Sequence, residues 1–128
     1  MPPRRRIPVA QGREALDRWL AGPDTADRTT TATAVRHLLE ELEQRHPGRS
    51  LEVRVPPFGA VQCVEGPVHT RGTPPSVVET DAVTWLRVAT GALSWDDAVT
   101  DGRVRASGRR AAIGALLPLV HPSSAAEY

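Results

Sequence analysis

Apolar residues recur at helical spacing in the first third of the chain. The pattern predicts a helix over residues 11–21, ended by Gly22 and Pro23, and a longer helix over residues 29–46. The apolar stripe of the longer helix consists of Val35, Leu38, Leu39 and Leu42. Three acidic residues of the same helix are expected to face water: Glu40, Glu41 and Glu43. The chain therefore opens with two amphipathic helices.

The spacing of apolar residues becomes alternating after His46. Leu51, Val53 and Val55 alternate with polar residues, which is typical of a half-buried strand. Prolines and a glycine interrupt the pattern before it resumes over residues 60–65, so the two segments predict a hairpin. Two further short strands are predicted over the segments 68–71 and 76–80.

The second half of the chain carries capping residues at helix boundaries. Asp81 is a candidate N-cap for a helix that Gly91 ends, and Ser94 is a candidate N-cap for a shorter helix. A fifth strand is predicted over residues 103–107, and a final apolar helix over residues 109–117. The final helix is inferred from the spacing of Ala112, Ile113, Leu116 and Leu117.

The order of these elements predicts an α+β fold with a five-stranded, mainly antiparallel sheet covered by helices on one face. Alternation within the strands supports this arrangement, because only one side of each strand is apolar. In the last strand, Val104 and Ala106 share that side. We expect a flexible arm over residues 1–9, one domain over residues 10–118 and a tail over residues 119–128.

Composition narrows the classes of partner. The 128 residues suffice for one domain with a hydrophobic core. Sixteen basic residues, all of them arginine, and fifteen acidic residues leave a net charge of +1, which argues against a polyanion-binding surface. Five aromatic residues provide no base-stacking platform, so no nucleic-acid partner is expected. The single cysteine and the lack of a signal-peptide or membrane-span pattern favour a cytoplasmic location without integral membrane association.

Candidate catalytic groups are few. Cys63 is the one thiol, and a tight turn after its strand would place it nearly opposite His69 or Thr70, which makes a Cys–His nucleophile sterically feasible. The simpler interpretation of Cys63 is a small buried side chain. The four histidines lack metal-ligand spacing, so we expect no metal and no cofactor. Asp96 and Asp97 stand in the first turn of a predicted helix, where negative charge is stabilising.

Four arginines cluster near the end of the predicted domain. Arg103 and Arg105 share one face of the last predicted strand, and Arg109 and Arg110 begin the final helix. Guanidinium groups hold carboxylates and phosphates through forked hydrogen bonds. Arg103, Arg105 and Arg109 are therefore candidates for holding an anionic head group. The alternative is a solvated sheet face whose charge is balanced by nearby aspartates.

Two strings of the sequence carry a family resemblance. One is the pattern G-x-L-x-W-x-x-A-V-x-x-G-R-V-x-A-x-G over residues 91–108, and the other is VPPFGAVQCVEGPVHTRGTPPSVVETD over residues 55–81. Both resemble the bacterial (actinobacterial) sterol carrier proteins, and the similarity covers about residues 10–118. The resemblance implies a five-stranded sheet with helices that enclose a hydrophobic tunnel for sterols, fatty acids or acyl-CoA.

The implied function is that of a non-enzymatic lipid carrier whose cavity lies between the sheet and the C-terminal helices. The residues expected to line this cavity are Trp85, Leu86, Ala89, Val104, Ala106, Ile113, Leu116 and Leu117. The same side chains would equally well fill a solid core. Two alternatives therefore stay open: a compact interaction or accessory module, which could be a homodimer, and a thiol-dependent enzyme that uses Cys63 and His69.

Overall fold

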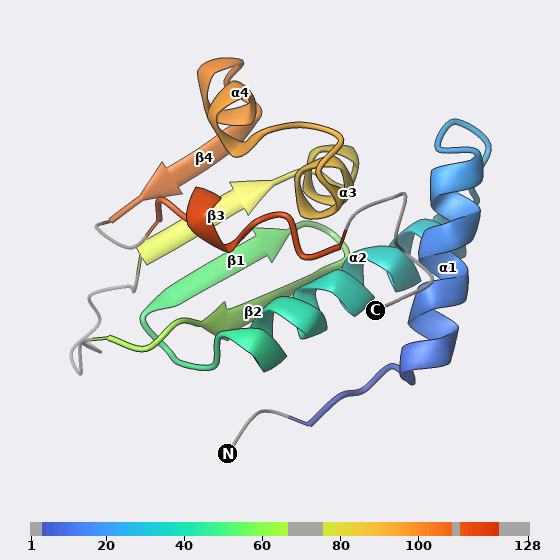
Figure 1. Cartoon of the computed structure of the whole chain (residues 1–128), viewed down its shortest axis with the longest axis horizontal. Coiled ribbons are helices and arrows are strands. Elements are labelled where there is room, and N and C mark those ends of the chain that lie inside the picture. The colour runs from blue at the N-terminus through green and yellow to red at the C-terminus, as the bar shows by residue number, and fades with distance from the viewer. Residues whose placement is uncertain (1–3, 67–75, 109–110, 121–128) are drawn as a thin grey trace.

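Two helices lead the chain, and a sheet interrupted by two more helices follows them (Figure 1). The computed structural model describes residues 4–66, 76–108 and 111–120. In order, the elements are α1 (Val9–Ala21), α2 (Arg28–Arg45), β1 (Leu51–Val55), β2 (Gly59–Cys63), β3 (Ser76–Thr80), α3 (Ala82–Thr90), α4 (Trp95–Thr100), β4 (Val104–Ser107) and the 3-10 turn η1 (Gly114–Leu116). Every predicted helix up to residue 100 is confirmed within a few residues of its expected bounds.

Side-chain caps fix the beginning of α2, α3 and α4, and a glycine ends α3. The Asp81 carboxylate accepts a hydrogen bond from the backbone N–H of Thr84 at 2.8 Å, and the Ser94 hydroxyl accepts one from Asp97 N–H at 3.1 Å. Gly91 ends α3 in the left-handed conformation, with φ at +82°. These predicted caps are confirmed. Asp27 caps α2 in the same way, so α2 begins at Arg28.

The sheet has the strand order β2-β1-β3-β4. β1 pairs with β2 and β3 with β4 in antiparallel fashion, whereas β1 and β3 are parallel. The predicted five-stranded sheet is not confirmed, because the described residues form four strands and the sheet is mixed. The predicted strand over residues 68–71 lies outside the described residues.

After the hairpin of β1 and β2, the next strand can pair with either of them. β2 runs antiparallel to β1 and ends where β1 begins, as the pairing of Leu51 with Cys63 shows. β3 starts at that same end, since Ser76 lies beside Leu51. A strand that starts there is antiparallel if it joins β2 and parallel if it joins β1. β3 pairs with β1, and the two strands are therefore parallel.

The core lies on one face of the sheet. Register and burial place Leu51, Val53, Val55, Cys63, Val78, Thr80 and Val104 on that face. The opposite face carries Glu52, Arg54, Glu79 and Arg105. In Figure 1, α2 lies along the sheet and α1 crosses α2 at the right of the view. Helices therefore cover one face, and the polar residues of the strands form the other.

The end of the chain departs from the prediction. The predicted helix over residues 109–117 is wrong, because the only helical turn among described residues 111–120 is η1. The backbone N–H groups of Leu119 and Val120 instead donate to the carbonyl of Ala89 at 2.8 and 3.1 Å. Pro118 has no N–H to continue a helix. The segment thus crosses the end of α3, and Leu119 and Val120, which the sequence analysis assigned to the tail, are buried.

We predict that Gly12→Ala destabilises the protein. A Cβ atom at Gly12 in α1 would lie 2.2 Å from Nδ1 of His37 in α2, so the two helices would have to separate. Overpacking of this kind costs about 1–3 kcal/mol, more than alanine gains in helix propensity. Urea denaturation measures the free energy of unfolding. Gly59→Ala is the matched control, since its Cβ would lie 3.5 Å from Leu39, an ordinary contact. Equal stabilities for the two variants would contradict this account of the α1–α2 contact.

Candidate ligand-binding site

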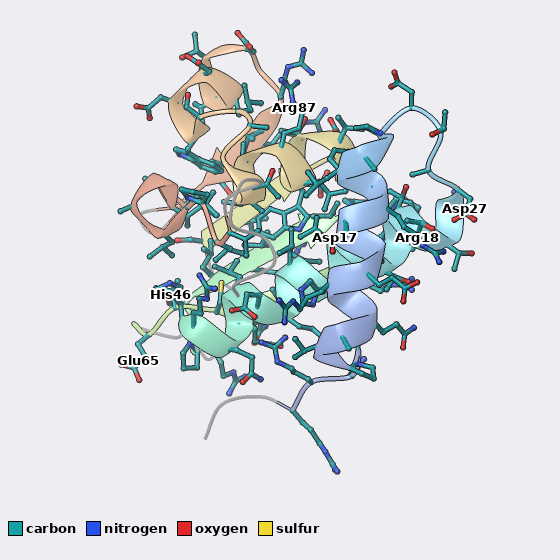
Figure 2. All side chains as sticks on the ribbon, turned by 45° about the vertical axis from the view of Figure 1, so that its right-hand side comes forward. Asp17, Arg18, Asp27, His46, Glu65 and Arg87 are labelled. Carbon is teal, nitrogen blue, oxygen red and sulfur yellow. The ribbon has the colours of Figure 1, made fainter. Side chains whose placement is uncertain are left out.

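The structure buries most of the residues expected to line a cavity. Trp85, Leu86, Ala89 and Ile113 are at most 2% exposed and belong to one packed core. Figure 2 shows side chains filling the space between the helices and the sheet, with charged residues such as Asp27 and Glu65 at the periphery. The expected residues therefore lie together, but as packed core side chains.

The remaining expected residues lie nearer the surface. Val104 is 8% exposed at the rim of the core. Leu116 and Leu117 are half-buried, and both pack against the core. Ala106 shares the register face of Val104 but is exposed, and β4 is the edge strand of the sheet. The structure does not bring Ala106 together with the buried residues.

An apolar groove of about 640 Å³ lies between the α3–α4 turn and the C-terminal segment. Its larger lining side chains are Val88, Leu93, Trp95, Asp96, Leu117 and Pro118. Small residues complete the walls, and Gly114 lies so close to the indole that a Cβ there would be 2.9 Å from Trp95 Cδ1. We term this site the C-terminal groove. Its size falls within the range of small-molecule sites.

Hydrogen bonds to α3 and α2 fix the wall that the C-terminal segment provides. The Ala89 carbonyl accepts from Leu119 and Val120, as described above, and the Arg45 guanidinium donates to the Leu119 carbonyl at 2.6 Å. On the opposite wall, Ala92 and Leu93 donate their N–H groups to the Arg87 carbonyl and close the turn after α3. The groove is thus built where the C-terminal segment crosses a capped helix end.

The arginines that the sequence predicts to hold an anionic head group do not line this groove among the described residues. Asp96 is the one charged residue among the described residues that line it. Arg103 is exposed and lies 3.9 Å from Asp101, and Arg105 lies opposite Glu79 on the polar face of the sheet. Arg109 lies outside the described residues. The structure therefore does not bring Arg103 and Arg105 to this groove.

The family model described as bacterial SCP ortholog, where SCP denotes sterol carrier protein, matches residues 27–119. The chain belongs to this family. The match begins at Asp27, the N-cap of α2, and includes every strand and the C-terminal groove. The resemblance inferred from residues 55–81 and 91–108 is thereby confirmed. No curated protein matches the chain. None of the helices in the described residues of this family member is long and apolar enough to cross a membrane.

Within this sterol carrier family domain, Cys63 is fully buried. Burial, with a smaller contribution from the charge of Glu43, raises the pKa of the Cys63 thiol to about 12. The thiol is therefore protonated at neutral pH, whereas a nucleophile needs the thiolate. His69, the candidate base, lies outside the described residues. The geometry at Cys63 supports the interpretation as a small core side chain.

α2 also carries two buried polar side chains. His37 is fully buried, and burial lowers its pKa. Glu40, which was expected to face water, is only 8% exposed, and its carboxylate accepts hydrogen bonds from the backbone N–H groups of Arg6 and Ile7. That expectation was wrong, because the residues before α1 fold back along α2. Glu41 is held by Arg5 and Arg45 in the same region.

We predict that Cys63 in the folded protein reacts with Ellman's reagent at least about 100-fold more slowly than in urea, because the buried thiol is neither charged nor accessible. Absorbance of the released thiolate measures the rate. The control is Cys63→Ala with Ala60→Cys, since Ala60 is exposed on the same strand and its replacement should react at once. Rapid labelling of native Cys63 would revive the thiol-dependent alternative.

We predict that the protein loses stability as the pH falls below about 6.5, the ordinary pKa of histidine. The pKa of His37 is lowered on folding, so the unfolded chain takes up a proton at a pH where the folded chain does not. Glu40 and Glu41 oppose this effect, and Arg5 and Arg13 add to it. Urea denaturation at pH 7.5 and 5.5 gives the difference in free energy of unfolding. His37→Gln should reduce that difference, and an unchanged difference would assign it to other groups.

Proposed function

We propose that the chain is a non-enzymatic lipid-binding domain that holds an apolar ligand in the C-terminal groove. Family membership supports the general function, since the chain belongs to the bacterial sterol carrier family. The observation that carries the proposal is the apolar groove of about 640 Å³, bordered by Val88, Leu93, Trp95 and Leu117. Candidate ligands are fatty acids, acyl-CoA and sterol-like molecules, of which only the apolar part would enter.

The lining of the groove favours an uncharged ligand segment. An anionic head group next to Asp96 would be repelled, and no guanidinium among the described residues borders the groove to compensate. We therefore assign the hydrocarbon part of a ligand to Leu93, Trp95 and Leu117. Ala89 and Ile113, which the sequence predicts to line a cavity, belong to the packed core and not to the lining of this groove.

The expected affinity is modest. Each buried methylene contributes about 0.8 kcal/mol, so a fully buried ten-carbon chain would contribute about 8 kcal/mol. Association itself costs at least about 4 kcal/mol. The difference is at most about 4 kcal/mol, which corresponds to a dissociation constant of about 1 mM or weaker. Such an affinity suits a carrier that must release its ligand.

The second candidate function is an interaction module with a filled core. The burial of Trp85, Leu86 and Ile113 to 2% exposure or less favours it, because these side chains leave little room among themselves. Such a module would bind no lipid-like probe, and its own partner, such as a second copy of the chain, would contact its surface. Ligand titration separates the two candidates.

We predict that N-decyl dansylamide, a neutral probe, binds saturably and accepts energy from Trp95, which borders the groove. Leu117→Arg should weaken binding at least tenfold, since it places a charge in the apolar lining. Dansyl fluorescence excited through tryptophan measures both effects. Val83→Arg is the control, because Val83 is 48% exposed on α3 and is not part of the groove lining. Circular dichroism verifies that both variants are folded.

Two results would contradict the proposal. If the wild-type chain shows no saturable binding, the filled-core candidate takes its place. If Leu117→Arg and Val83→Arg weaken binding equally, the probe binds somewhere other than the C-terminal groove.

A further inference from the structure

A second pocket, of about 500 Å³, lies between the residues before α1, the middle of α2 and strand β2. We term it the arm pocket. Its charged lining residues are Arg4, Arg5, Arg6, Arg36, Glu40 and Glu43. Its apolar lining residues are Ile7, Leu39, Phe58, Ala60 and Val61. Four guanidinium groups thus share one pocket with two carboxylates and an apolar floor.

We propose that the arm pocket binds an amphiphilic anion, in which a phosphate or carboxylate group carries a short apolar chain. The charged group would lie among Arg4, Arg6 and Arg36, and the chain would lie on Leu39, Phe58 and Val61. This site is separate from the C-terminal groove and does not depend on the function proposed for it.

The residues before α1 are fixed by backbone contacts and by the Arg5 side chain, which leaves the Arg4 and Arg6 side chains uncommitted. The N–H groups of Arg6 and Ile7 donate to the Glu40 carboxylate at 3.2 and 3.1 Å. Arg5 forms an ion pair with Glu41 through Nη2. Glu40, the one buried carboxylate of the pocket, is therefore occupied by peptide groups, which hold this segment over α2.

Several guanidinium donors of the pocket have no acceptor. The Arg4 and Arg6 guanidinium groups make no hydrogen bond to the residues that the structure describes, and Arg5 Nη1 is buried without an acceptor among them. Arg36 donates through Nε to the Phe58 carbonyl at 2.7 Å, so both terminal nitrogens stay available. A guanidinium has five N–H donors. Phosphate and carboxylate groups match them with several acceptor oxygens.

The balance of charge favours an anion as well. Four arginines and two glutamates line the pocket, and Arg5 is also paired with Glu41, which leaves an excess of one positive charge. Burial and the charge of Glu40 raise the pKa of Glu43, although Arg6 opposes this effect. A bound anion would offset the excess charge without displacing the contacts of Glu40. An uncharged ligand would leave the excess positive charge uncompensated.

The floor of the pocket supplies an apolar surface for the apolar chain of the ligand. Leu39 is 1% exposed, and Phe58 and Val61 are half-buried at the edge of the sheet. Arg28 already lies over the Phe58 ring, 5.2 Å from its centroid. A bare inorganic anion would contact none of this apolar surface. An amphiphile uses both halves, which is why we prefer it.

Part of the pocket lining lies outside the family match. The family match begins at Asp27, so Arg4 to Ile7 lie outside it. These residues supply three of the four arginines and one apolar wall. Family membership alone therefore gives no reason to expect this site.

The test uses the full-length, ¹⁵N-labelled protein and titrations with octyl phosphate, octanol and inorganic phosphate. Octyl phosphate should shift the amide signals of Ala60 and Val61 and bind at least tenfold more tightly than inorganic phosphate, while octanol should leave these signals in place. Arg4→Gln combined with Arg6→Gln should weaken octyl phosphate binding at least tenfold. This variant keeps the backbone contacts to Glu40. The control is Arg18→Gln combined with Arg103→Gln, which removes the same charge from exposed positions and should bind as the wild type does.

Other outcomes would overturn the proposal. Equal binding of octyl phosphate and octanol would remove the role of the anion, and equal binding of octyl and inorganic phosphate would remove that of the apolar floor. Equal weakening in the two double variants would indicate attraction by net charge alone. Shifts confined to Leu93 and Trp95 would assign the probe to the C-terminal groove. If phosphatidylglycerol vesicles bind through Arg4 and Arg6 while octyl phosphate does not, these arginines contact membrane surfaces instead.

Discussion

Helix α2 packs on two sides at once, and the other elements rest on it. Its apolar stripe contacts the sheet through Val35, Leu38, Leu39 and Leu42, all at most 1% exposed. On another side, His37 meets α1 at a position where only glycine fits. The Trp85 indole of α3 donates to the carbonyl of Val35 at 3.3 Å, which ties the second helical pair to the same element. A helix buried on several sides must accommodate polar groups, and here His37 and Glu40 are those groups.

Local signals predicted most elements of the fold. Caps such as Asp81 and Ser94 act within three residues of the chain, so sequence spacing reveals them. Alternation in residues 51–55 sets the buried face of β1 for the same reason. The pairing of β1 with β3 depends on residues more than twenty positions apart, and no local pattern specifies it. The strand order and the mixed pairing of the sheet could therefore not be predicted from the sequence.

The C-terminal segment shows that helical spacing of apolar residues does not by itself produce a helix. Ile113, Leu116 and Leu117 have helical spacing, yet they pack around a short 3-10 turn. The carbonyl of Ala89 and the indole of Trp95 decide the course of this segment, and both belong to distant elements. The burial of Glu40 was not predicted for the same reason, since the groups that donate hydrogen bonds to it are backbone groups more than thirty residues away. Spacing identified candidate apolar residues, but tertiary contacts decided which of them border a groove.

Both candidate sites lie at the rim of the core, beside the buried side chains that α1, α2 and α3 contribute. A sheet covered on one face has a single apolar layer, and α1, α2 and α3 occupy it. Space for a ligand is left where irregular segments cross this layer: the residues before α1 over Glu40, and the residues after β4 over Ala89.

The residues before α1 are held over α2 by hydrogen bonds to Glu40 and by the Arg5–Glu41 ion pair, whereas the C-terminal segment also buries Ile113, Leu119 and Val120 in the core. The wall that Arg4 to Ile7 provide can therefore yield to a ligand at a lower cost than the wall beside Leu117. The two proposed sites differ in charge, since arginines line the arm pocket whereas Asp96 is the one charged residue among the described residues that line the C-terminal groove.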